Sequence, residues 1–315
     1  MRRSQKLLYH IIAFCFLCPF FLAGCGKNAA ARTETAFALD TVVRVTVYAE
    51  ADVPAARAAL ARCADYEAVF SRTRADSELA RINAAGGGTV SEDLRAVLGC
   101  AIEVSARSGG ALDVTLGAVS ALYDFAAENP APPDAAAVAA ALASSGMDGV
   151  SLRGSELTLA PGAVLDLGAV AKGYIADRLA EDLRAAGVEH AIVNLGGNVV
   201  CIGARPDGKP FQVGVQEPVP GSEKNAAVLS VTDGSVVTSG NYQRYFDYNG
   251  VRWHHILDPE TGYPVQNGLA SVTVTGPESM LCDALSTACF VLGEEAGYAL
   301  LAEYPEYEAI FLPGR

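Results

Sequence analysis

The sequence lacks the signatures of several large functional classes. Only His190, His254 and His255 lie beyond the N-terminal segment, and no cysteine spacing matches a zinc site. Neither a Walker A loop nor a Rossmann glycine fingerprint occurs. Basic residues are also scarce, with 23 Lys and Arg against 36 Asp and Glu. This acidic balance argues against nucleic acid as a partner, because phosphates require basic patches.

No apolar run reaches the length that a membrane-spanning helix usually needs. Residues 7–21 are almost entirely apolar, which is short of the roughly 20 residues that a spanning helix needs. Three basic residues precede this run, and Leu-Ala-Gly followed by Cys25 ends it. A transmembrane anchor is the alternative, but this order predicts a lipoprotein signal over residues 1–24, with Cys25 as the lipidated N-terminus.

Lipidation at Cys25 predicts where the protein works. Removal of the three basic residues of the signal changes the net charge from −13 to −16, so attraction to anionic lipid cannot hold the chain at a membrane. The acyl chains of the lipidated cysteine would supply the anchor. We therefore expect an extracytoplasmic protein, lipid-anchored to the cell membrane through a tether over residues 25–36.

The remaining cysteines predict no disulfide framework. They are odd in number and have apolar neighbours, so we expect free, buried thiols at Cys63, Cys100, Cys201, Cys282 and Cys289.

Beyond the tether, the chain predicts one α+β domain over residues 37–315. An apolar fraction of 51% supports a sizeable core, and strands mix with helices without strict βαβ alternation. Apolar periodicity predicts helices over 54–70, 92–108, 134–145, 171–186 and 278–292. It predicts strands over 41–49, 191–194, 199–203, 211–216, 228–232, 236–239, 253–257 and 271–275, and a hairpin over 151–159. No internal repeat and no long linker divides the chain.

Asp283 and Thr287 form the first candidate site. Four residues apart in a predicted helix, they project from one face, and together their oxygens suit a hard cation such as Mg²⁺. The alternative is that Thr287 bonds back to the carbonyl of Asp283 and water solvates the acid. Small and apolar neighbours would leave such an acid poorly hydrated, which favours a partner.

Residues 165–174 form the second candidate site. A strand is expected to end near Leu167, and a helix to begin just before Lys172. Gly168 and Gly173 let the backbone approach a ligand, while the helix N-terminus and Lys172 attract phosphate. A second glycine element follows at 194–198. Both segments are alternatively ordinary turns.

Aromatic residues dominate the third candidate region, over 238–246 and 253–264. They either close a core or line a site, and a histidine on a strand is more often a core group than a catalytic one.

Taken in order, these segments resemble the ApbE family of FAD:protein FMN transferases. The resemblance covers about residues 37–312, and its motifs occupy 112–117, 166–174, 194–197, 239–244, 255–264 and 283–287. It implies a single T-fold-related α+β domain that binds FAD with Mg²⁺ at the pyrophosphate.

The resemblance also implies the residues of the site. The metal ligands would be Ala169 through its carbonyl, Asp283 and Thr287. The residues at FAD would be Leu39, Ala111, Leu112, Asp113, Asp166, Lys172 and the backbone near Leu257. The family reaction transfers FMN to a threonine hydroxyl of an acceptor redox protein and releases AMP, with His255 or Asp258 as the candidate base. Hydrolysis of FAD to FMN and AMP, or flavin binding without turnover, are the alternatives.

This chain departs from the family pattern in four places. Leu39-Asp40-Thr41 replaces a motif that usually begins with Met, Thr73 stands where an aromatic often stacks, and Cys282 precedes the metal acid where a small residue is common. The chain also ends soon after Leu312, so we expect a trimmed last strand.

Overall fold

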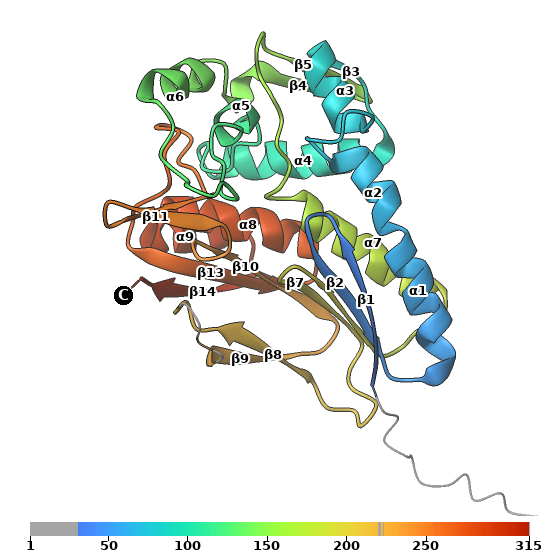
Figure 1. Cartoon of the computed structure of the whole chain (residues 1–315). Coiled ribbons are helices and arrows are strands. Elements are labelled where there is room, and N and C mark those ends of the chain that lie inside the picture. The colour runs from blue at the N-terminus through green and yellow to red at the C-terminus, as the bar shows by residue number, and fades with distance from the viewer. Residues whose placement is uncertain (1–30, 220–221, 223, 315) are drawn as a thin grey trace, which may run out of the picture.

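A computed structural model describes residues 31–219, 222 and 224–314 (Figure 1). The predicted signal, Cys25 and the first part of the predicted tether lie outside these residues. Within the part that the structure describes, no helix has the length and apolar character to cross a membrane.

A seven-stranded sheet forms the centre of the fold (Figure 1). Its order is β1-β2-β6-β7-β10-β13-β14, and each neighbouring pair is antiparallel. The strands are β1 (Arg32–Ala38), β2 (Thr41–Val47), β6 (Ala191–Leu195), β7 (Asn198–Ile202), β10 (Gly234–Gly240), β13 (Leu269–Gly276) and β14 (Glu308–Pro313). The predicted α+β class is confirmed.

Three smaller antiparallel sheets flank the large one. They are formed by β3 (Gly87–Thr89), β5 (Glu156–Leu159) and β4 (Val150–Arg153), by β8 (Phe211–Gln216) and β9 (Asn225–Val231), and by β11 (Tyr245–Tyr248) and β12 (Val251–His254).

The α-helices are α1 (Val53–Ala61), α2 (Cys63–Phe70), α3 (Glu78–Ala85), α4 (Glu92–Arg107), α5 (Gly117–Ser120), α6 (Ala135–Leu142), α7 (Ala171–Ala185), α8 (Ser279–Leu292) and α9 (Glu294–Leu301). Side chains cap two of these helices: Ser91 accepts from Leu94 N–H at the start of α4, and Asp134 accepts from Ala137 N–H at the start of α6.

Strand alternation gives the large sheet two different faces. Val43, Val45 and Val47 are fully buried in the main core, on the face that α7 and α8 cover. On the other face, Cys201 and Val236 pack against the β8–β9 hairpin, which lies below the large sheet in Figure 1. The five described cysteines are free, and all are buried except Cys100, which is half-buried.

Helices α7 and α8 cap each other where they cross. Asp177 of α7 accepts the backbone N–H groups of Ser279 and Met280, at 2.9 and 2.8 Å, at the start of α8. In return, Asp283 of α8 accepts the N–H of Gly173, at 2.9 Å, in the first turn of α7. Each carboxylate thus satisfies donors that the other helix leaves unpaired at its N-terminus.

Three predictions of local structure are corrected. Residues 32–36, assigned to the tether, belong to β1. Pairing with β2 holds this segment as a strand, and its exposed polar side chains give no sign of that pairing. The helix over 54–70 breaks at Arg62, whose N–H bonds the carbonyls of Ala59 and Leu60, without any glycine or proline to signal it. The last strand is not trimmed, because β14 pairs with β13 along its length.

Gly173 permits the crossing of α7 and α8, and this generates a stability prediction. A Cβ at Gly173 would press on the Ser279 carbonyl oxygen and lie 2.7 Å from Met280 Cα. Gly173→Ala should therefore lower the free energy of unfolding by about 1–3 kcal/mol, measured by denaturant titration. Gly99→Ala is the matched control: a Cβ at this exposed position in α4 meets nothing, so a gain of about 0.5–1 kcal/mol is expected. Wild-type stability in Gly173→Ala would show that the helices can separate.

Candidate active site

The crossing of α7 and α8 brings the first two candidate sites together. Asp283 has a side chain only 4% exposed, and its Oδ1 lies 3.8 Å from Lys172 Nζ. Lys172 Nζ also donates to the carbonyl of Gly168 at 3.3 Å. A buried carboxylate, an ammonium group and a helix N-terminus therefore share one corner of the molecule.

Thr287 lies one turn after Asp283 and contacts the sheet. Its Oγ1 is 3.1 Å from Ser239 Oγ of β10, which is also 2.8 Å from Ser286 Oγ. The alternative in which Thr287 bonds back to a solvated Asp283 is wrong. Ser286 Oγ donates to the Asp283 carbonyl instead, and the acid is buried.

The oxygen atoms at this corner fit a hard cation. Asp283 offers a carboxylate, Thr287 a hydroxyl, and Ala169 a backbone carbonyl just before α7. The Gly173 N–H, four residues after Ala169, bonds Asp283 instead of that carbonyl. Within the described residues there is no cluster of three or more His, Cys, Asp or Glu side chains suited to a metal. The corner offers mixed oxygen donors, which is the chemistry Mg²⁺ prefers.

Two adjacent loop segments form a wall beside this corner. Leu116 pairs with Val164 in a parallel bridge, and the Val114 carbonyl accepts from Asp166 N–H at 2.8 Å, which brings the first segment next to Asp166. Asp113 Oδ1 accepts from the N–H and hydroxyl of Thr115, at 2.7 and 2.6 Å. The predicted residues Ala111, Leu112 and Asp113 therefore lie on the same wall as Asp166.

Asp166 is held by bonds from three segments. Its Oδ1 accepts from Gly168 N–H at 3.1 Å, and its Oδ2 accepts from Ser120 Oγ at 2.9 Å. Arg72 Nε lies 3.3 Å from the same Oδ2. Sequence reasoning missed Arg72, because no local pattern connects it to an acid so far along the chain.

The turn between β1 and β2 adopts a conformation that is unusual for its residues. Ala38 pairs with Thr41, so Leu39 and Asp40 form a two-residue loop with φ of 56° and 55°. In this left-handed region the Cβ atom of an L-residue crowds the following carbonyl oxygen, so residues other than glycine disfavour it. Glu67 Oε1 of α2 accepts the Leu39 N–H at 2.5 Å and fixes the turn. Glu67 also escaped sequence reasoning.

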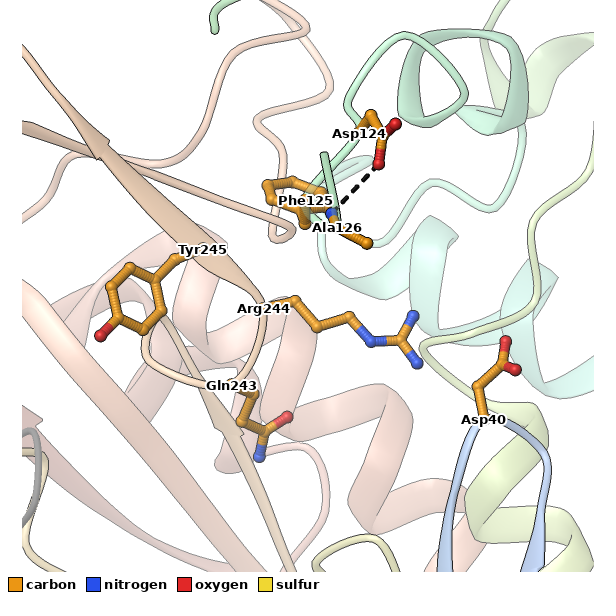
Figure 2. Close-up of a pocket in the computed structure, with 7 residues that line it drawn as sticks. All are labelled: Asp40, Asp124, Phe125, Ala126, Gln243, Arg244 and Tyr245. Atoms are coloured by element: carbon orange, nitrogen blue, oxygen red, sulfur yellow. Dashed lines mark hydrogen bonds between the residues drawn. The ribbon is translucent and has the colours of Figure 1, made fainter. Parts of the chain in front are cut away.

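A cleft of about 410 Å³ opens beside this turn. Figure 2 shows the Arg244 side chain extending toward Asp40, with Asp124 and Phe125 above it in this view. Gln243, Tyr245 and Ala126 complete the lining. Sequence reasoning placed Arg244 in a motif but gave it no role.

His255 connects the cleft to the corner formed by α7 and α8. Its backbone N–H donates to the Arg244 carbonyl at 3.2 Å, and its Nδ1 lies 3.4 Å from the same oxygen. Burial and the nearby charge of Lys172 lower the pKa of His255 to about 4, with smaller contributions from His254 and Arg244. His255 is therefore neutral at pH 7.

The neighbours of His255 have structural contacts. His254 is buried, donates through Nε2 to the Val265 carbonyl, and accepts from Ile256 N–H. Asp258 forms a turn in which its Oδ1 accepts from Glu260 N–H and its carbonyl from Gly262 N–H. Leu257, which precedes this turn, pairs with Pro264.

Comparison with known proteins identifies the family of this chain. The sequence pattern of the ApbE family matches residues 39–311. The chain belongs to the ApbE family. A protein of Treponema pallidum named FAD:protein FMN transferase is 37% identical over 96% of this chain and 90% of its own length. One of Klebsiella pneumoniae with the same name is 39% identical over 78% of each chain.

Solved ApbE structures have the same fold. A crystal structure of an ApbE protein from Thermotoga maritima matches with a TM-score of 0.82 and 31% identity, over 90% of this chain and 94% of that one. The flavin transferase ApbE from Vibrio cholerae matches with a TM-score of 0.81 and 27% identity, over 91% and 94%. The fold and the family expected from the motifs are confirmed.

The low pKa of His255 generates a prediction about acid stability. Between pH 6.5 and pH 4 the unfolded chain binds a proton at this residue and the folded chain does not, so folding stability falls as the pH falls. His255→Asn removes this term. Its unfolding free energy should therefore decline less steeply across this window, by up to about 1 kcal/mol per pH unit. Parallel stability curves for the two proteins would contradict the assignment.

Proposed function

We propose that this chain transfers FMN from FAD to a threonine hydroxyl of an acceptor protein, releasing AMP, with Mg²⁺ required. The observation that carries the proposal is the buried carboxylate of Asp283 beside Lys172 and Thr287 at the N-terminus of α7. The names of the ApbE relatives support the flavin chemistry. An acid this buried needs a cation, and Lys172 at 3.8 Å only partly supplies one.

The reaction exchanges a phosphoanhydride bond of FAD for a phosphoester bond to the acceptor. The acceptor hydroxyl oxygen attacks the phosphorus on the FMN side of the FAD pyrophosphate, while the bond from that phosphorus to the bridging oxygen breaks. FMN becomes esterified to the acceptor, AMP leaves with the bridging oxygen, and the hydroxyl proton passes to a base. Positioning and charge neutralisation dominate the catalysis of such transfers.

Asp283, Thr287 and the Ala169 carbonyl would hold Mg²⁺. When bound, the metal would neutralise charge on the pyrophosphate oxygens. Lys172 adds a second positive charge, and the N-terminus of α7 adds its partial charge. Asp283 is thus assigned two tasks, because its Oδ2 already accepts from Gly173 N–H.

His255 is the better candidate base of the two. Asp258 Oδ1 is bonded within its own turn, whereas His255 is neutral and lies beside Arg244 at the cleft. A pKa of about 4 makes His255 a weak base in the free protein. Phosphates bound near Lys172 would offset one of the charges that lower this pKa, so substrate binding would itself raise the basicity of His255.

The remaining predicted residues would hold the dinucleotide. Ala111 to Asp113 and Asp166 lie on the wall beside the corner, Leu39 lies on the strained turn between β1 and β2, and Leu257 lies near His255 along the chain. We assign the flavin and ribose contacts to this wall because it is the structured surface adjacent to Lys172.

The proposal includes the location of the reaction. The signal pattern that ends at Cys25 supports an extracytoplasmic protein with a lipid anchor. Such an anchor would place the site next to membrane-associated redox proteins, which we assign as the acceptors.

The test is to incubate residues 26–315 with FAD, Mg²⁺ and a candidate acceptor domain, and to look for covalent flavin fluorescence in a denaturing gel. Asp283→Asn keeps an acceptor for Gly173 N–H but loses the charge, so it should fold and label at least about a hundredfold more slowly. Asp65→Ala, at an exposed acid of α2, is the control and should label normally.

Each alternative outcome has its own meaning. FMN and AMP formed at the same rate with every acceptor, without labelled protein, would indicate a hydrolase. Unchanged FAD throughout would indicate a binding protein. Full labelling by Asp283→Asn, or labelling that withstands a chelator, would contradict the metal role.

A further inference from the structure

Asn198, the first residue of β7, has a buried amide without a partner. The residue is 2% exposed, and no hydrogen bond reaches its Nδ2 from any part of the chain that the structure describes. Buried polar groups are almost always paired, so a buried orphan donor requires an explanation.

Asn198 lies on the face of the sheet that the helices cover. Val200, two residues along β7, belongs to the main core, whereas Val199 and Cys201 belong to the cluster under the β8–β9 hairpin. Side chains alternate along a strand, so Asn198 faces the same way as Val200. Both α7 and α8 contact β7.

Along the sheet, Asn198 lies at the level of the proposed site. Helix α7 ends just before β6 begins, so the end of β6 and the start of β7 lie near the beginning of α7, where Lys172 is. Continuing the β7–β10 register beyond Val199 and Val236 puts Val237 opposite Asn198. Two residues further on the same face is Ser239, which contacts Thr287.

The other acceptors near this position are already engaged. Ser239 Oγ is shared by Ser286 and Thr287, and Asp283 Oδ2 accepts from Gly173. The preceding turn consists of Gly196 and Gly197, which have no side chains to pair with the amide. The Asn198 donor therefore has no partner among the residues that the structure describes.

We propose that Asn198 Nδ2 donates a hydrogen bond to a phosphate oxygen of the dinucleotide. This inference deepens the proposed function and rests on its assignment of the pyrophosphate to the corner formed by α7 and α8. Asn198 would lie below Lys172 and Asp283 at that corner. Its amide is neutral, so it would donate a hydrogen bond without electrostatic repulsion of the metal or the lysine.

The test measures binding of two flavins to the apo protein in the presence of Mg²⁺. Asn198→Leu keeps a similar volume and loses the donor. It should raise the Kd for FAD about ten- to a hundredfold and leave binding of riboflavin, which has no phosphate, unchanged. Without ligand its melting temperature should equal or exceed that of wild type, because an unpaired buried donor has been removed.

Asn198→Asp separates a phosphate donor from a metal ligand. A carboxylate repels phosphate, so FAD binding should weaken at least as much as in Asn198→Leu. If the amide oxygen instead held the metal, Asp would keep or strengthen Mg²⁺ binding measured without flavin, and this result would overturn the proposal. Asn225→Asp is the control, because it adds the same charge at an exposed position of β9, in the hairpin that covers the other face of the large sheet.

The inference and the proposed function can fail separately. An unchanged Kd for FAD in Asn198→Leu, or an equal loss for riboflavin, overturns the role of Asn198 even if wild type flavinylates an acceptor. Conversely, Asn198→Leu could lose affinity for FAD but not for riboflavin while the wild type transfers no FMN to any acceptor. That combination would support the role of Asn198 and refute the transferase.

Discussion

The reciprocal capping of α7 and α8 is the constraint on which the site depends. Asp177 and Asp283 each satisfy the N-terminal donors of the other helix, and Gly173 lets the two backbones meet. One contact thus positions Lys172, at the start of α7, against Asp283, in the second turn of α8. A side chain that binds a ligand is usually supported by its neighbours, and here Asp283 is itself one of the supports.

This arrangement concentrates positive potential in an acidic protein. The chain carries a formal net charge of −13, yet the charges of Lys172 and Arg244 add to the effect of burial in lowering the pKa of His255. Net charge governs long-range attraction, whereas local charges govern what a site accepts. An anionic ligand can therefore bind at this corner even though the surface as a whole repels nucleic acid.

The sequence predicted those parts of the site that local patterns encode. Asp283 and Thr287 share a helix face, and Lys172 lies at a helix N-terminus, so spacing alone brought each pair of features together. Arg72, Glu67 and Arg244 escaped prediction, because each acts on a residue brought near it only by the completed fold. Periodicity likewise predicted β2, but β1 depends on its pairing with β2, and the break at Arg62 has no local signal.

The strained turn at Leu39 and Asp40 shows how the fold holds a conformation that the sequence disfavours. Two consecutive non-glycine residues with positive φ cost on the order of 1–2 kcal/mol each relative to a right-handed conformation. Pairing of β1 with β2 on both sides and the bond from Leu39 N–H to Glu67 offset that cost. Glycines here would relieve the strain, but they would remove the Leu39 side chain from the core that it packs against and the Asp40 carboxylate from the lining of the cleft. Strain retained where glycine would relieve it points to a need for these two side chains, one in packing and one at the cleft.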